Sequence, residues 1–280
     1  MKSLILTYAI STIIYSVLSI FFWQHLYKNK EFEKINIKLH VFLLIGIIAH
    51  GFSLRANLLE NNSLFLNPTI GFSAILWLSL IILWTENTIA RKMGRLYLIL
   101  LPLGALSCIL AANFAKKSLI QSSENYWLRI HLFLALSSYG LITVAAFHAI
   151  FMALLNYYLR NFLKKISENS FVNQIFEIQP PILIQEKILF RTIGIGFLFL
   201  TLTVGSGLVA SVIVLNETSW LFDHKIIFTL LSWVTFGLLL LGRYRWGWRG
   251  RVALHWTLSG FLFLVLTYVS QKFIISKIIS

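Results

Sequence analysis

The chain has 280 residues, of which 58% are hydrophobic and only 12% are charged. Soluble domains carry roughly 25% charged residues, so this composition excludes an ordinary water-soluble protein. The net charge of +14 requires no nucleic-acid partner, because Lys and Arg collect in the loops of membrane proteins. A single cysteine, Cys108, excludes an internal disulfide, a CxxC redox pair and covalent haem attachment through CxxCH.

Eight apolar runs are long enough to cross a bilayer, for which a helix needs roughly 20 mostly apolar residues. The first run is longer than a signal-peptide core and no small-residue cleavage site follows it, so we expect it to remain as a helix. The pattern predicts an all-α, polytopic integral membrane protein with one bundle of transmembrane helices in a single domain, residues 1–280. The expected helices lie near residues 4–25, 38–57, 66–85, 95–113, 126–157, 188–214, 224–242 and 252–274.

Basic residues are distributed unevenly over the predicted loops. Sixteen of the 24 Lys and Arg residues lie in the connections after the first, third, fifth and seventh helices. Since loops rich in Lys and Arg stay in the cytoplasm, both termini are predicted on the outer, periplasmic side of the cell inner (plasma) membrane. The densest basic loop, Arg243–Arg251, fits a cytoplasmic anchor with interfacial tryptophans, and binding of an anionic ligand or lipid headgroup remains open.

Acidic residues avoid the apolar runs, and all ten lie outside them or at their ends. Because a charge buried in lipid is costly, this segregation fits a membrane-spanning chain. No carboxylate is therefore expected at mid-membrane, which argues against a proton pump or cation antiporter that works by a carboxylate relay. The longest polar stretch, residues 158–187, contains Pro180 and Pro181 and predicts a hinge between a 1–157 half and a 188–280 half.

With carboxylates and cysteine pairs excluded, histidine is the residue type that can ligate a metal in the predicted membrane region, and the chain has seven histidines. The predicted orientation places three of them, His50, His131 and His224, toward the outer face. The helices that begin near His131 and His224 run in the same direction, so both imidazoles enter the membrane at one depth. Because imidazole ligates haem iron along its axis, this pair predicts two ligands of a b-type haem, with His50 as a further cofactor contact.

Basic and aromatic neighbours support this outer-face site. Each outer histidine has a cation nearby, and Arg or Lys side chains neutralise the propionates of haem. A tryptophan in the loop ahead of a ligand is placed to stack on a porphyrin. The cations are Arg55, Arg129 and Lys225, and the tryptophans are Trp127 and Trp220.

Other interpretations of these residues remain open. The histidines also suit hydrogen-bonded packing inside the membrane, and the tryptophans suit an interfacial belt. The three histidines, with Asp223 as a carboxylate, also suit a zinc site. Small residues from Thr201 to Ser211 in the sixth helix are typical of close helix packing, and alternatively leave a slot for a flat cofactor.

Several stretches, taken in their order along the chain, resemble one family. They are Ala49–Arg55 (AHGFSLR), Ile130–Tyr139 (IHLFLALSSY), Gln185–Lys187 (QEK), and Asp223–Lys225 (DHK) leading to Gly242–Arg251 (GRYRWGWRGR). The pattern resembles the cytochrome c assembly protein family, which groups the haem-handling CcsA and CcmC types with HemX-like membrane proteins. The resemblance covers nearly the whole chain and is greatest to the HemX-like branch.

The resemblance implies haem binding and delivery at the outer face, with His131, which opens the fifth helix, as an axial ligand. It implies haem and an apocytochrome or another assembly protein as partners, within the lipid bilayer. Haem-lyase members carry a tryptophan-rich outer segment, of which this chain keeps Trp220 and Asp223. We therefore expect a non-enzymatic assembly factor rather than thioether-bond formation. The alternatives are a haem-free scaffold or regulator that retains the family fold, and a small-molecule transporter.

Overall fold

The computed structural model describes residues 2–27, 37–60, 63–64, 66–90, 94–114, 126–162, 182–210 and 224–279. Within these residues, 8 helices are long and apolar enough to cross a membrane, which confirms the predicted helical membrane fold. They are α1 (Lys2–Tyr27), α2 (Ile37–Leu58), α3 (Pro68–Ala90), α4 (Tyr97–Phe114), α5 (Tyr126–Phe162), α7 (Ile182–Ala210), α8 (His224–Trp246) and α9 (Gly250–Ile279). A 3-10 turn, η2 (Gly94–Leu96), leads into α4. The placement of both termini on the outer side stays a prediction.

One short hairpin departs from the all-helical expectation. The strands β1 (Leu59–Glu60) and β2 (Ser63–Leu64) pair antiparallel, directly after the end of α2. Strands of two residues are too short to show the alternating pattern by which a sequence reveals a strand. The sequence therefore does not predict the hairpin, which leaves the helical architecture unchanged.

The start of α3 shows how the sequence sets a helix boundary. The Asn67 Oδ1 atom accepts hydrogen bonds from the Ile70 amide at 2.7 Å and from the Thr69 hydroxyl at 2.8 Å. Pro68 occupies the first helical position, where a backbone N–H would have no hydrogen-bond partner within the helix, so proline loses nothing by lacking one. The helix therefore begins at Pro68, close to the predicted start.

The helices group into two compact units, called the N-terminal unit and the C-terminal unit. The N-terminal unit comprises residues 1–120 and 155–182, and the C-terminal unit comprises residues 121–154 and 183–280. The predicted 1–157 half is therefore wrong for α5, most of which belongs with the C-terminal helices. Chain order does not fix packing partners, and α5 contacts α7 where Ile142 lies against Gly196. The expectation of a single domain stays a prediction.

In the N-terminal unit, α1 lies against α2 and α4, and α3 also lies against α2 and α4. Two indole N–H groups of α3 donate to carbonyls of α2. Trp77 Nε1 bonds the Ile47 oxygen at 2.8 Å, and Trp84 Nε1 bonds the His40 oxygen at 3.1 Å. Polar side chains inside a bilayer need protein partners, and these bonds supply them between helices.

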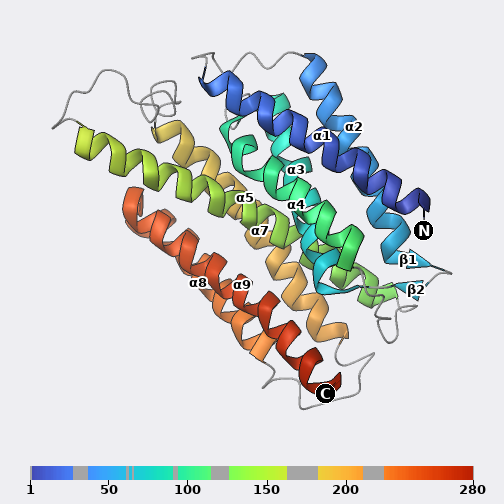
Figure 1. The fold of residues 1–280 in the computed structure, drawn as a ribbon. Coiled ribbons are helices and arrows are strands. Elements are labelled where there is room, and N and C mark those ends of the chain that lie inside the picture. The colour runs from blue at the N-terminus through green and yellow to red at the C-terminus, as the bar shows by residue number, and fades with distance from the viewer. Residues whose placement is uncertain are drawn as a thin grey trace. The chain divides into compact units, whose positions relative to one another are not determined.

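In the C-terminal unit, α8 and α9 run side by side (Figure 1). The Ser232 hydroxyl donates to the Gly260 carbonyl at 2.8 Å, which joins these two helices. The indole of Trp233 joins α8 to α7, because its Nε1 donates to the Thr201 hydroxyl at 2.9 Å and its ring stacks on Phe197. Polar bonds between apolar helices thus fix the arrangement of this unit.

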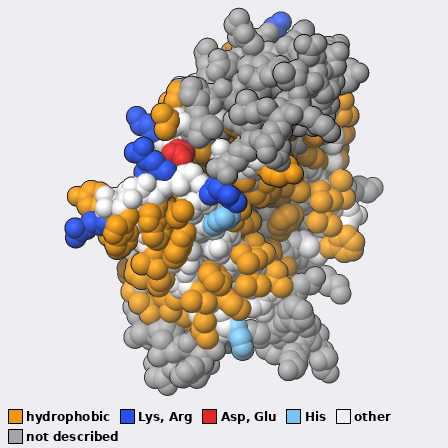
Figure 2. Space-filling model, turned by 90° about the vertical axis from the view of Figure 1, so that its left-hand side faces the viewer, with side chains coloured by type: hydrophobic (Ala, Val, Ile, Leu, Met, Phe, Trp, Pro, Cys, Tyr) orange, Lys and Arg blue, Asp and Glu red, His pale blue; other side chains and the backbone are white. Residues whose placement is uncertain are grey.

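Large hydrophobic side chains are exposed in both units, and Figure 2 shows many of them on one face. Examples from five different helices are Ile13, Ile45, Phe133, Leu198 and Leu241. A soluble protein does not expose apolar surface on this scale, whereas lipid tails cover it without cost. These exposed side chains are therefore the expected lipid-facing surface.

Candidate functional site

His131 lies in the second turn of α5 and points to the small residues of α7. Its Nδ1 atom is 3.1 Å from the Ser206 hydroxyl oxygen. That hydroxyl donates its own proton to the Thr203 carbonyl at 3.1 Å, so it accepts a hydrogen bond from His131 Nδ1–H. The Thr203 backbone is a second hydrogen-bond partner of the same ring. Donation from Nδ1–H to the Ser206 oxygen fits this network.

The contact of 3.1 Å with Ser206 engages Nδ1, one of the two ring nitrogens of His131. Among the described residues, Ser206 and the Thr203 backbone are the hydrogen-bond partners of the ring. The ring rests on the backbone of Gly207, where an added Cβ would lie 3.1 Å from His131 Cε1. Beside Gly205, two residues earlier, an added Cβ would meet no atom within 4 Å. The site therefore combines an imidazole held by hydrogen bonds with a glycine of α7 that the ring covers.

His224 is the first residue of α8, and its side chain is exposed. Among the described residues it has no hydrogen-bond or ion-pair partner. The neighbouring Lys225 interacts electrostatically with the His131 ring, so the start of α8 lies within range of the α5 histidine. The charge of Lys225 thus acts on the His131 ring, while the described residues show no direct contact between the two predicted ligands.

Two further predicted site residues share α5 with His131. Trp127 and Arg129 lie in its first turn, Trp127 with an exposed indole and Arg129 half-buried. Both have interaction partners in the protein. Their place on the helix puts an aromatic ring and a cation at the end of α5 that carries His131. Trp220 and Asp223 lie outside the described residues.

His50, the third predicted cofactor histidine, sits in a different environment in the N-terminal unit. Its side chain is 0% exposed. Nε2 is 2.8 Å from the Ser73 hydroxyl of α3, and Nδ1 is 3.3 Å from the Tyr15 hydroxyl of α1. Iron ligation by His50 would first require one of these contacts to break, and its assignment to the cofactor stays a prediction. Arg55, in the last turn of α2, is exposed.

The rings around His50 complete a buried aromatic and polar cluster. Tyr8 and Tyr15 of α1 meet the imidazole edge to face, with ring centroids 6.1 Å and 5.8 Å away. Asn57, further along α2, donates to the Tyr8 hydroxyl at 2.9 Å. The cluster holds α1, α2 and α3 together, which is the packing alternative that the sequence left open.

A multi-ligand metal site finds no support among the described residues. Within them, no group of three or more His, Cys, Asp and Glu side chains is placed to hold a metal ion. The zinc alternative needs three histidines, and both ring nitrogens of His50 are engaged by Tyr15 and Ser73. A haem site differs in this respect, because it needs only one or two protein ligands.

Ser206 and Thr203 are site residues that the sequence does not single out. Their small side chains are typical of helix packing, with a cofactor slot as the alternative. The pattern Gly205-Ser206-Gly207 predicts close approach, but nothing in it indicates which ring will approach. Only the packing of α5 on α7 shows that the ring is that of His131.

The chain also has relatives among known proteins. The family model described as Cytochrome C assembly protein matches residues 6–279. The Inner membrane protein YpjD of Escherichia coli (strain K12) is 28% identical over 257 residues, which cover 91% of each chain. The Cytochrome c biogenesis protein CcsA of Heterosigma akashiwo (strain NIES-293 / 8280G21-1) is 27% identical over 237 residues, 72% of each chain. The protein of the same name from Trieres chinensis is 26% identical over 292 residues, covering 94% of this chain and 89% of its own. No solved structure matches.

Proposed function

The chain belongs to the Cytochrome C assembly protein family, and from that premise we propose that it binds haem b at the outer membrane face through His131 and His224. Family membership supports a haem-related role in cytochrome c biogenesis. The 8 apolar helices of the described residues make it a multi-pass membrane protein. The Escherichia coli relative is named as an inner membrane protein, which supports the same membrane for this chain.

The state of the His131 ring is the observation that carries the proposal. A histidine that ligates a metal through one nitrogen usually donates its other N–H to an oxygen of the protein, which fixes the tautomer and the ring orientation. The Nδ1–Ser206 contact gives His131 this arrangement, with Nε2 as the nitrogen that we propose for the iron. The donor set therefore fits an axial ligand that is oriented before haem arrives.

The second ligand and the charges come from neighbouring positions. His224 supplies an exposed imidazole at the start of α8, next to Lys225, whose charge acts on the His131 ring. Haem supplies an iron that accepts axial nitrogen ligands and carries two propionates. Lys225 and Arg129 would neutralise those propionates, and the exposed indole of Trp127 would cover part of the macrocycle.

The proposed activity is binding and presentation rather than bond formation. We expect haem to be held at the outer face and passed to an apocytochrome or another assembly protein. The exposed position of His224 supports this proposal, because a ligand at the surface is displaced more readily than a buried one. Of the tryptophan-rich segment of haem-lyase members, this chain keeps Trp220 and Asp223. The loss of the rest supports an assembly factor that does not form thioether bonds.

The test is an absorbance spectrum of the protein purified in mild detergent and titrated with haemin, before and after dithionite. The wild type should give a Soret band that sharpens on reduction and is joined by b-type α and β bands. His131→Ala should weaken haemin binding at least about tenfold, the lower end of the loss expected when a ligand arrangement is disrupted. His255→Ala is the matched control, because this exposed histidine lies on α9 of the same unit.

A rescue experiment separates ligation from folding. In His131→Gly, free imidazole added to the solution should restore the reduced b-type bands, since it replaces the missing side chain. His224→Ala should leave a spectrum typical of one protein ligand, and the double variant should bind no haem. Unchanged bands in both single variants and in the double variant would contradict the ligand assignment. A wild type that binds no haemin would favour the haem-free scaffold.

A further inference from the structure

The loop between α8 and α9 has a defined conformation that small residues make possible. Gly247 and Gly250 adopt φ values of 66° and 56°, which side chains rarely tolerate. The Trp248 amide donates to the Gly242 carbonyl at 3.2 Å, and the indole of Trp248 covers Gly242 where any side chain would overlap it. The same indole stacks on Trp246 and packs at a tilt against Trp256. The loop is therefore a fixed turn with an aromatic stack.

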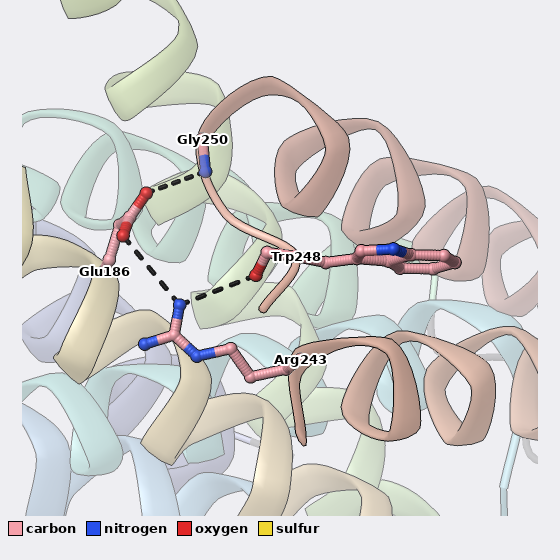
Figure 3. Close-up of polar contacts among 4 residues, drawn as sticks. All are labelled: Glu186, Arg243, Trp248 and Gly250. Carbon is pink, nitrogen blue, oxygen red and sulfur yellow. Dashed lines mark hydrogen bonds and ion pairs between the residues drawn. The ribbon is translucent and has the colours of Figure 1, made fainter. Parts of the chain in front are cut away.

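Glu186 of α7 holds this turn from the side (Figure 3). Its Oε1 atom accepts a hydrogen bond of 2.7 Å from the Gly250 amide, at the positive end of the α9 dipole. Its Oε2 atom lies 3.9 Å from Arg243 Nη1, and the same nitrogen donates a long bond of 3.5 Å to the Trp248 carbonyl. The Arg243 guanidinium also lies 4.3 Å above the Phe190 ring. The Glu186 charge is thus already balanced by Arg243 and the α9 terminus.

Three further arginines lie in or beside the turn and are not engaged by Glu186. Arg245, Arg249 and Arg251 are exposed, and within the described residues their guanidinium groups have no carboxylate partner. The exposed Lys187 adds a fourth cation next to Glu186 in the sequence. Figure 2 shows Lys and Arg side chains gathered beside exposed hydrophobic side chains. A surface with this charge favours an anion.

Apolar and aromatic side chains border the same arginines. Tyr244 and Trp246 are 85% and 66% exposed, and large aromatic rings at the edge of a membrane lie at the level of the lipid headgroups. Leu241, in the last two turns of α8, and Val252, in the first turn of α9, are also exposed. The ligand that fits this surface has an anionic head and apolar chains. We infer that Arg245, Arg249 and Arg251 form a binding site for the phosphate of an anionic phospholipid.

Arginine recognises a phosphate group through hydrogen bonds as well as through its charge. Its planar guanidinium bonds two phosphate oxygens at once, and the fixed turn keeps three such groups within seven consecutive residues, Arg245 to Arg251. A soluble phosphate would use the arginines alone and gain nothing from Trp246 or Leu241. A phospholipid uses both, which is why the lipid is the proposed occupant.

The test is native mass spectrometry of the full chain in detergent with equal amounts of phosphatidylglycerol and phosphatidylcholine that carry identical acyl chains. The wild type should retain phosphatidylglycerol with a preference of about tenfold, given three juxtamembrane cations on one site. In R245Q/R249Q/R251Q the preference should disappear. The matched control R245K/R249K/R251K keeps the charge and should retain a reduced preference, because lysine lacks the paired donors.

Competition with soluble phosphate distinguishes the two sources of the phosphate group. Inorganic phosphate at millimolar concentration should not displace phosphatidylglycerol, and complete displacement would make soluble phosphate the occupant and overturn the inference. An equal retention of both lipids by the wild type would also overturn it, as would an unchanged preference in the glutamine variant. If the triple glutamine variant does not fold, Arg249→Gln replaces it, with an expected loss of about half of the preference. Because no variant touches His131 or His224, haem spectra of the same samples test the proposed function separately.

Discussion

His50 in the N-terminal unit and His131 in the C-terminal unit look alike in the sequence but differ in the structure. Each lies in an apolar helix with an arginine within five positions. His50 is enclosed by α1 and α3, which engage both of its nitrogens through Tyr15 and Ser73. The hydrogen-bond partners of His131 among the described residues, Ser206 and the Thr203 backbone, both lie on α7. The hydrogen bonds of His50 thus join three helices, whereas those of His131 join α5 to α7.

The two histidines should also contribute differently to the stability of the fold. A buried imidazole with two partners stabilises the fold, and its loss leaves two other polar groups without a bond. The half-buried imidazole of His131, whose partners Ser206 and Thr203 both lie on α7, joins fewer helices and should contribute less to folding. Substitutions at His50 should therefore reduce stability, and substitutions around His131 should reduce haem binding.

The largest effect is expected for His50→Ala. The change opens a cavity among Tyr8, Tyr15 and Ser73 and leaves both hydroxyls unpaired, at a cost of about 3 kcal/mol in the free energy of unfolding. Thermal unfolding in detergent measures the effect as a lowered midpoint. Tyr15→Phe, which removes only the 3.3 Å contact to Nδ1, should lower the midpoint far less. Equal midpoints for His50→Ala and the wild type would break the comparison.

The next effect is expected for Gly207→Val. Branched carbons at this position would push the His131 ring off the α7 backbone, since even a Cβ would lie 3.1 Å from Cε1. Misplacement of a ligand should weaken haemin binding about tenfold, as measured by spectrophotometric titration. Gly205→Val is the matched control two residues away, where a Cβ meets nothing within 4 Å. The same affinity in both variants would show that the ring position is unimportant.

A smaller effect on haemin affinity is expected for Ser206→Ala. The change removes the acceptor of the Nδ1–H bond, but the Thr203 carbonyl remains as a second acceptor. We therefore expect only about a threefold loss of haemin affinity, below the usual range for a lost partner of a metal ligand. Redox titration of the bound haem should also show a shifted midpoint, which a purely structural role of Ser206 would not produce. Ser206→Thr should restore both values.

The smallest effect is expected for Trp233→Phe in the α7–α8 contact. The indole N–H bond to Thr201 is lost, and a single side-chain bond between membrane helices contributes about 0.6 kcal/mol on average. Stacking on Phe197 is retained by the phenyl ring. Thermal unfolding should show a small decrease, and haemin binding should stay unchanged. A loss of haem comparable to that in Gly207→Val would mean that α8 controls the site.

The membrane fold could be predicted from the sequence because lipid imposes one rule on every segment. Runs of roughly 20 apolar residues reveal spanning helices, and all of the expected spans have a counterpart among the described helices. The predicted ends are less accurate, and α7 begins at Ile182 rather than near 188. The predicted start near 188 follows the charged residues Glu186 and Lys187, because the apolar run begins there. The helix itself also includes these charged residues, since a helix can extend beyond its apolar segment.

The partners of the site could not be predicted, because they come from packing. The sequence indicates His131, but the Ser206 and Gly207 contacts arise only where α5 crosses α7. Predicted depth groups His50 with His131, and depth does not reveal how many neighbours surround a ring. The same limit explains why chain order alone assigns α5 to the N-terminal helices.

The most direct test of the contrast is to titrate His131→Ala and His50→Ala with haemin side by side and to record thermal unfolding of the same samples. The structure predicts that His131→Ala loses the reduced b-type α band while its unfolding midpoint matches the wild type. It predicts that His50→Ala unfolds at a lower temperature and keeps the band at wild-type strength per folded molecule. The reverse pattern, with the band lost at His50 and retained at His131, would contradict the proposed site.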